Sequence, residues 1–130
     1  MNETLQHILI IAAVVAAVLY LVLNLFDNAI KYNRQAGTIR CELKIVGGMA
    51  VFRIANSGED IPPADRERIF NRFFRVESSR ARSDVSGGGQ GLGLSIAREI
   101  VRAHGGTLTL EPSERGWIVF QFTIPIAAVA

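Results

Sequence analysis

A run of glycines leads directly into an amphipathic stretch, and this junction constrains the chain more than any other segment. Gly87 to Gly93 reads GGGQGLG, and LSIAREIVRAHGG follows immediately. Glycine lets the backbone take positive φ and approach a ligand closely, and the first turn of a helix presents unpaired N–H groups at the positive end of its dipole. The junction predicts a site for a phosphate-bearing ligand, whereas a flexible glycine loop is the alternative explanation.

Three more ordered segments lie upstream of the glycine run. In chain order they are LNLFDNAIKYN at Leu23–Asn33, IANSGEDI at Ile54–Ile61 and RIFNRFFR at Arg68–Arg75. Together with Gly87–Leu94, they resemble the N box, first glycine box, F box and second glycine box of the ATP-binding domain of sensor histidine kinases, in the GHKL ATPase superfamily. The resemblance covers residues 20–125.

Length, charge and cysteine content limit the class of protein. With 130 residues, the chain fits a single domain that can bury a core. Its formal net charge of +2 is too small to favour nucleic acid as a partner, although arginines gather between residues 66 and 82. Cys41 is the only cysteine, so an intrachain disulfide is impossible. Because Cys41 lies in an expected strand without an adjacent base, we predict a buried structural thiol.

An apolar run near the amino terminus, Ile8–Leu23, contains no charged residue. A helix of that length measures about 24 Å, which is short of the roughly 30 Å hydrocarbon core of a membrane. Lengthening it would bring Asn24, Asp27 and Asn28 into lipid. Three explanations stay open: a truncated or tilted membrane anchor, a signal-like segment without its usual basic start, and a helix buried by the domain itself.

The start of the chain departs from the family pattern near Leu19 and Tyr20. Relatives place an extended strand and a polar Gly-Asp-like entry before the N-box helix, and neither is found in residues 1–19. We therefore divide the chain into an apolar segment of uncertain origin, residues 1–19, and an ATP-binding domain of the histidine kinase type, residues 20–130. One hypothesis is that a membrane-proximal segment of a longer sensor has been fused to this domain.

Hydrophobic periodicity and turn residues predict the elements of the domain. The expected helices cover residues 20–32, 62–70 and 92–103, and the expected strands cover residues 38–46, 49–55, 107–111 and 117–125. Strand 38–46 alternates apolar and polar residues and is expected to be half-buried, with a hairpin turn at Gly47 and Gly48. The pattern gives an α+β fold. The resemblance implies a two-layer α/β sandwich of the GHKL type, the Bergerat fold, with a mixed sheet and helices on one face.

Residues 74–90 show no hydrophobic period and are rich in serine, arginine and glycine. A loop of this length in a compact domain usually has a function. We expect a lid that bound ATP orders, as the resemblance also implies.

The polar face of helix 20–32 is the candidate site for phosphates and their cation. An asparagine carbonyl can ligate Mg²⁺ without adding charge, and we assign that role to Asn28. Asn24 lies one turn earlier on the same face, where it can bond a phosphate or a metal-bound water. Lys31 and Tyr32 are expected to contact phosphate, and Asn28 and Lys31 are also assigned catalytic roles. The alternative is a merely solvated polar face.

Adenine recognition depends on an acceptor for the amino group, which the family supplies as an aspartate in the first glycine box. Asn56 occupies that position here. Its neutral amide oxygen can still accept a hydrogen bond, at a cost of about 1 kcal/mol relative to a carboxylate. Gly58 would permit close approach, and Ile61 would line the adenine pocket. The alternative is that residues 56–58 simply form a turn.

The remaining site residues come from the F box and the second glycine box. Phe70 is expected first in the core and also beside the nucleotide. Arg75 is assigned a catalytic role and Arg72 a phosphate-binding or lid-ordering role, because guanidinium groups match phosphate oxygens, although exposed arginines are often only solvated. The resemblance places further residues at the nucleotide, namely Gly89, Gly91, Leu92, Gly93 and Leu94.

The resemblance implies transfer of the γ-phosphoryl group of ATP to a histidine, with Mg²⁺ as a second cofactor and a response regulator as a later partner. In the family, the acceptor histidine precedes an acidic residue in a helical dimerisation domain, whereas His7 here precedes Ile8. We therefore expect this chain to bind ATP without phosphorylating itself. As part of a membrane-bound sensor kinase, it would be cytoplasmic, with membrane contact through residues 8–23.

Two other functions stay open on the sequence. One is a serine or threonine kinase of the anti-sigma-factor type, and the other is a non-catalytic nucleotide-binding or interaction module with the same fold. Acid-stable phosphate on a partner would indicate the first, and loss of ATP binding would indicate the second.

Overall fold

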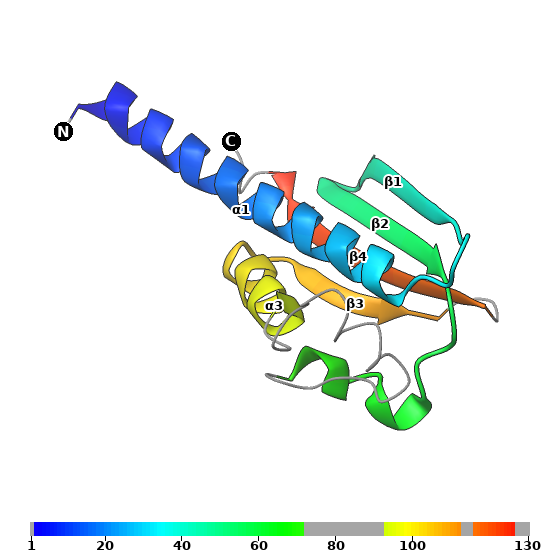
Figure 1. Ribbon diagram of the computed structural model, residues 1–130. Helices are drawn as coiled ribbons and strands as arrows, with labels where there is room; N and C mark the ends of the chain where they lie inside the picture. The colour runs from blue at the N-terminus through cyan, green and yellow to red at the C-terminus, as the bar shows by residue number, and fades with distance from the viewer. Residues whose placement is uncertain (1, 72–92, 113–115, 127–130) are drawn as a thin grey trace.

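The computed structural model describes residues 2–71, 93–112 and 116–126. They form a two-layer α+β sandwich in which α1 and α3 lie on one face of a four-stranded sheet (Figure 1). The strand order is β1-β2-β4-β3. The strands are Ile39–Val46 (β1), Met49–Ser57 (β2), Thr107–Glu111 (β3) and Trp117–Pro125 (β4). The predicted α+β class and the placement of the helices on one face are confirmed, whereas the lid at residues 74–90 lies outside the described residues.

All strand pairings of the described sheet are antiparallel, so the prediction of a mixed sheet is wrong for this part of the chain. Gly47 and Gly48 both take positive φ and turn β1 directly into β2. A second hairpin joins β3 to β4, and β2 meets β4 at the centre. Such short connections join antiparallel neighbours, whereas a parallel pair needs a long crossover.

A single helix, α1 (Glu3–Tyr32), contains both the apolar run and the N box. Asn2 caps its start, because Oδ1 accepts a hydrogen bond from the Leu5 N–H at 2.7 Å. The second half of α1 packs on α3 and β2, where Leu21 and Leu25 are fully buried. The helix therefore runs without a break through the proposed boundary between residues 19 and 20.

The first half of α1 projects beyond the sheet (Figure 1). Val14 is almost buried there, but apolar side chains are exposed all around it, namely Leu5, Ile8, Leu9, Ile10, Ile11, Val15 and Leu19. By length and composition, α1 could cross a membrane. From Val18 onward, however, one side of the helix packs against the core of the domain, whereas Leu19, Leu23 and Ile30 on the other side stay exposed. Burial by the domain therefore explains one side of the second half of the apolar run, whereas the projecting half is exposed nearly all around.

The core lies between the helices and the sheet. The rings of Phe52 and Phe122 lie 5.3 Å apart, and Phe70 meets Phe120 edge-on at 6.2 Å. The helix α3 (Gly93–Ala103) contributes apolar side chains of its amphipathic face, including the fully buried Val101. Burying each large apolar side chain of this kind contributes about 1.5–3 kcal/mol.

The strand β1 is far more exposed than predicted. Its register places Cys41 opposite the buried Ile54 and Leu43 opposite the buried Phe52, so these side chains do point to the helix-covered face. However, α1 packs mainly on β2, and every residue from Arg40 to Val46 is exposed. The prediction of a buried Cys41 is therefore wrong. Partial burial nevertheless desolvates the Cys41 thiol and raises its pKa.

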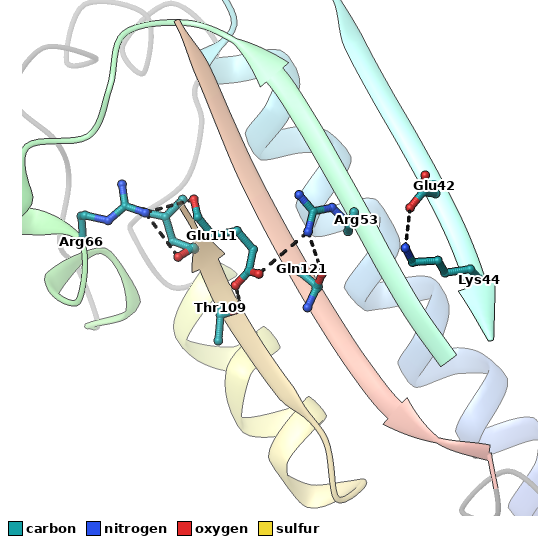
Figure 2. Close-up of polar contacts among 8 residues, drawn as sticks. Glu42, Lys44, Arg53, Arg66, Thr109, Glu111 and Gln121 are labelled. Atoms are coloured by element: carbon teal, nitrogen blue, oxygen red, sulfur yellow. Dashed lines mark hydrogen bonds and ion pairs between the residues drawn. The ribbon is translucent and has the colours of Figure 1, made fainter. Parts of the chain in front are cut away.

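After β2, the chain forms two 3₁₀ turns, η1 (Pro63–Asp65) and η2 (Arg68–Phe70), where the sequence predicted one short helix. The guanidinium of Arg66 donates from Nη2 to the carbonyl oxygens of Leu110 and Glu111 at 3.3 and 3.1 Å (Figure 2). Phe70 enters the core a few residues later. Arg66 and Phe70 thus hold this segment at two points. Between Pro63 and Phe70 it forms two short turns instead of one continuous helix.

Polar side chains cover the face of the sheet that the helices leave open (Figure 2). Arg53 donates from Nη1 to Gln121 Oε1 at 3.0 Å and lies 3.9 Å from a carboxylate oxygen of Glu111. Along β1, Lys44 Nζ lies 3.4 Å from Glu42 Oε1, and both side chains are more than half exposed. The two faces of β1 are therefore chemically distinct, with charges on one and apolar side chains on the other.

Candidate functional site

Four of the predicted site residues lie on the second half of α1. Asn24, Asn28, Lys31 and Tyr32 are each partly buried, whereas Asp27 is exposed. Their spacing of three, four and seven residues places them on one flank of the helix. This flank adjoins the buried stripe that packs into the core, namely Leu21, Leu25 and Ala29. The polar flank therefore lies beside the core of the domain and is not part of the fully exposed side of α1.

The start of α3 meets this flank at Asn24. Gly93 is the first residue of α3, and a Cβ atom placed on it would lie 2.5 Å from Asn24 Oδ1. Such a distance is too short for a side chain, so the close approach depends on glycine. The structure thus brings the second glycine segment against the N-box segment, and Asn24 lies at the amino-terminal turn of α3, where unpaired N–H groups favour anions.

Gly58 lies against the carboxyl end of α1. A Cβ atom on Gly58 would lie 2.8 Å from the carbonyl oxygen of Tyr32. Because a helix rises 1.5 Å per residue, Asn24 and Tyr32 lie about 12 Å apart along α1. The two glycines therefore mark the two ends of the polar flank, one on α3 and the other after β2.

Asn56 is a buried amide at the end of β2, with 3% of its surface exposed. Its Nδ2 donates to the carbonyl oxygen of Ser57 at 3.0 Å. Since the nitrogen is used within the protein, Oδ1 is the atom that could accept a hydrogen bond from a ligand. Within the described residues, no buried side-chain nitrogen or oxygen lacks a partner. Asn56 is therefore held in place next to Gly58.

Ser57, which the sequence places in an expected turn, is the centre of a clasp in the structure. Its Oγ accepts from the Thr38 N–H at 2.8 Å and donates to Asn33 Oδ1 at 2.7 Å. Its carbonyl oxygen accepts from the Arg34 N–H at 3.3 Å. The clasp ties the end of α1 to the end of β2, and so it fixes the two sides of the polar flank relative to each other. In the sequence, the only indication of this role is the position of the serine between Asn56 and Gly58.

The apolar site residues lie at the border of the core. Ile61 and Leu94 are partly buried and pack against the core cluster. Phe70 is 4% exposed, and Arg98 stacks on its ring with the guanidinium carbon 4.6 Å from the centroid. Phe70 thus has the packing role that was expected first, and its contact with a nucleotide stays a prediction. Arg98, which the sequence did not single out, also lies 3.4 Å from the exposed carboxylate of Glu67.

Several predicted site residues lie outside the described part of the chain. They are Gly89, Gly91 and Leu92 of the second glycine segment, together with Arg72 and Arg75. Their assignments stay predictions.

The donors available for a cation are amide oxygens. Across residues 2–71, 93–112 and 116–126, no group of three or more His, Cys, Asp or Glu side chains could hold a metal ion. A carboxylate-built metal centre is therefore not present in this part. The amides of Asn24 and Asn28 suit a cation that arrives with phosphates, because Mg²⁺ commonly combines a few protein oxygens with phosphate oxygens.

Most of the chain matches a known family of ATPases. The family model described as "Histidine kinase-, DNA gyrase B-, and HSP90-like ATPase" matches residues 14–128. The chain belongs to this ATPase family. The match includes every described site residue and the second half of α1.

Within the ATPase family, the chain resembles histidine kinases in sequence. It is 41% identical over 106 residues to the signal transduction histidine-protein kinase ArlS of Staphylococcus epidermidis. The match covers 82% of this chain and 23% of ArlS. The chain thus spans about a quarter of the length of the curated relatives it matches.

Solved structures of histidine kinases have the same fold. The mycobacterial sensor histidine kinase MprB superposes with a TM-score of 0.72 at 33% identity, over 85% of this chain and 72% of MprB. The histidine kinase ThkA, solved in complex with the response regulator protein TrrA, superposes with a TM-score of 0.65 at 31% identity, over 83% of this chain and 28% of that chain. In sequence and fold, the chain resembles the catalytic domains of histidine kinases.

Proposed function

We propose that this chain is the ATP-binding catalytic part of a sensor histidine kinase. The observation that carries the proposal is the approach of Gly93 to Asn24 Oδ1. This contact joins the glycine segment at the start of α3 to the polar flank of α1. Asn56 and Gly58 lie at the other end of that flank. One nucleotide could therefore place its phosphates near Gly93 and its adenine near Asn56.

Each residue of the flank has a role in this proposal. Asn28 would hold Mg²⁺ through its amide oxygen, and Asn24 would bond a phosphate or a water on the cation. Lys31 and Tyr32 would donate to phosphate oxygens. When bound, Mg–ATP supplies the phosphoryl group and offsets its charge. The residues of the chain then act by positioning that group toward an acceptor.

The adenine end of the site is proposed from Asn56, Gly58 and Ile61. Asn56 Oδ1 would accept from the amino group, and Gly58 would let the base approach the end of β2. Ile61 and Phe70 would pack near the base from the core side. The residues that lie outside the described ranges complete the proposal on the phosphate side, namely Gly89, Gly91, Leu92 and Arg75, with Gly93 and Leu94 from α3.

The phosphoryl acceptor is proposed to be a histidine on a separate dimerisation domain, and a response regulator would receive the group next. The complex of ThkA with TrrA supports the second step by analogy. We propose that the domain, residues 20–130, faces the cytoplasm. The exposed apolar side chains of the run at residues 8–23 would contact lipid, and most of them lie in the projecting half of α1.

A transfer assay tests the proposed reaction. The chain is mixed with ATP labelled at the γ-phosphate and with the dimerisation domain of ArlS, supplied separately. We expect acid-labile, base-stable phosphate on that domain and none on this chain. Asn28→Ala should abolish transfer, whereas Asp27→Ala, a change at the exposed neighbouring position, should retain it. Label on this chain alone, or acid-stable label on the partner, would contradict the proposal.

The exposure of β1 favours a second candidate, a non-catalytic module of the same fold. Cys41, Leu43 and Ile45 of β1 point to the helix-covered face but are exposed, and only Ile39 of this row packs against the core in the described residues. A sheet that is incomplete at this edge would leave the site with weaker support. In that case the folded chain would bind a non-hydrolysable ATP analogue weakly or not at all, and transfer would also be absent.

A further inference from the structure

The strand β1 lies at an outer edge of the described sheet (Figure 1), where it pairs with β2 alone. The two-residue turn at Gly47 and Gly48 closes on the pair of Val46 and Met49. Even-numbered residues of β1 therefore bond to β2. The odd-numbered residues direct their N–H and C=O groups outward, namely Ile39, Cys41, Leu43 and Ile45. An edge of this kind is a template for another strand.

The same odd-numbered residues form an apolar row on the helix side of the sheet. Leu43 is 68% exposed and Ile45 is 63% exposed, although their row continues the core face of β2. On the α1 side, Ile30 lines one hollow together with Ile39, and the turn after α1 completes this hollow with mostly polar residues. A free backbone edge and an uncovered apolar row thus lie side by side on β1.

We infer that two copies of this chain pair edge to edge through β1, antiparallel and centred on Leu43. In this register, Leu43 faces Leu43 of the second copy, and Cys41 faces Ile45. The apolar rows of the two copies become neighbours on one face. About six backbone hydrogen bonds join the odd-numbered residues. On the other face, Glu42 lies opposite Lys44 of the second copy, and Lys44 lies opposite Glu42.

Charge complementarity selects this register among the alternatives. Edge charges normally block pairing, but on β1 they alternate in sign, which lets an antiparallel copy match them. A register centred on Glu42 would place the two Glu42 side chains opposite each other and Arg40 opposite Lys44. A register centred on Lys44 would oppose two lysines. Centring on Cys41 would pair Arg40 with Glu42, but it would use only the first part of β1.

The pairing also covers the apolar row of β1. A two-fold axis perpendicular to the sheet keeps both α1 helices on one side, above the two β2 strands. With strands about 4.8 Å apart, the two helices lie about 14 Å from each other. Helices with their side chains are about 10 Å wide. The remaining gap of about 4 Å suits the side chains of the two β1 rows. The projecting halves of α1 then point in opposite directions.

Disulfide trapping tests the register. In a hydrogen-bonded antiparallel pair, the Cα atoms lie about 5.5 Å apart, within the range that a disulfide spans. We expect the full chain with C41S and L43C to form a covalent dimer on mild oxidation, in non-ionic detergent that covers each projecting end of α1. The unmodified chain should not form one, because Cys41 faces Ile45. A covalent dimer through native Cys41, or none with L43C, would overturn the register.

Charge exchange tests the interface without altering any buried residue. E42K places lysine opposite Lys44 twice and should raise the dimer dissociation constant about tenfold. The double variant E42K and K44E restores opposite charges and should restore pairing. E59K, at an exposed position away from β1, changes the net charge equally and should have no effect. Sedimentation measures all three. A monomer at every concentration, or equal dissociation constants for E42K and the double variant, would contradict the inference.

Discussion

Asn24 on α1 and Gly93 on α3 are so close that a Cβ atom on Gly93 would lie 2.5 Å from Asn24 Oδ1. The atom in the way is the end of a side chain, which can rotate. The consequence of a larger residue at position 93 should therefore appear in the orientation of Asn24 before it appears in the stability of the fold.

Gly93→Ala should weaken binding of an ATP analogue more than it changes stability. Alanine favours a helix over glycine by up to about 1 kcal/mol, which offsets part of the crowding. Displacing the Asn24 amide should cost about 1–3 kcal/mol of binding free energy. Titration calorimetry and thermal unfolding measure the two effects separately. In the Asn24→Ala background, Gly93→Ala should have little further effect on binding, and a full additional loss there would refute the proposed contact.

Gly58→Ala should behave differently, because its obstacle is rigid. The Cβ atom would lie 2.8 Å from the carbonyl oxygen of Tyr32, and a backbone oxygen cannot rotate away. The end of α1 or the turn after β2 must shift, so we expect a loss of about 1–3 kcal/mol in the free energy of unfolding. Urea unfolding followed by circular dichroism checks this value. An unchanged midpoint would show that the two segments can separate freely.

Ser57→Ala should destabilise the fold by about 1–3 kcal/mol. It removes the acceptor for the Thr38 N–H and the donor to Asn33 in a site where Ser57 is only 2% exposed. The matched control is Thr107→Ala, because that hydroxyl shares a 3.0 Å bond with Thr123 but is exposed. The control should change stability by less than about 0.5 kcal/mol. Equal effects of the two substitutions would argue against the clasp.

The thiol of Cys41 should react in the folded protein, because the side chain is exposed. Partial desolvation raises the pKa of this thiol. Its alkylation rate should therefore keep rising up to a higher pH than the rate of a free cysteine does. The sign for stability follows from the same shift. The protonated thiol favours the folded state relative to the thiolate. This contribution to stability is full below the pKa of Cys41 in the unfolded chain and is lost as pH rises through its pKa in the folded chain. At low protein concentration, a thiol that reacts only after denaturation would contradict the exposure of β1.

Much of the fold could be predicted from local patterns. The strands 107–111 and 117–125 and the hairpin turn at Gly47 and Gly48 are found where alternation and turn residues placed them. These features depend on neighbours in sequence, which a single chain shows directly. The N-box polar flank could also be predicted, because its asparagines share one face of a helix by spacing alone.

Features that depend on what lies above or beside an element could not be predicted in this way. The alternation in β1 gives the correct face for Cys41 and Leu43, but it cannot show that α1 packs on β2 and leaves that face open. The roles of Ser57 and Arg66 depend on partners that are distant in sequence. The expected mixed sheet followed from the family, and the antiparallel pairings replace it for the described strands.

The most direct test of the proposed nucleotide site is calorimetric titration of the folded chain with a non-hydrolysable ATP analogue, with and without Mg²⁺. Asn28→Ala is titrated alongside Asp27→Ala, its exposed neighbour on α1. We predict saturable, Mg²⁺-dependent binding that Asn28→Ala loses and Asp27→Ala keeps. Binding that is absent from the folded parent chain, or that is unchanged in Asn28→Ala, would contradict the assignment of this flank of α1 as the nucleotide site.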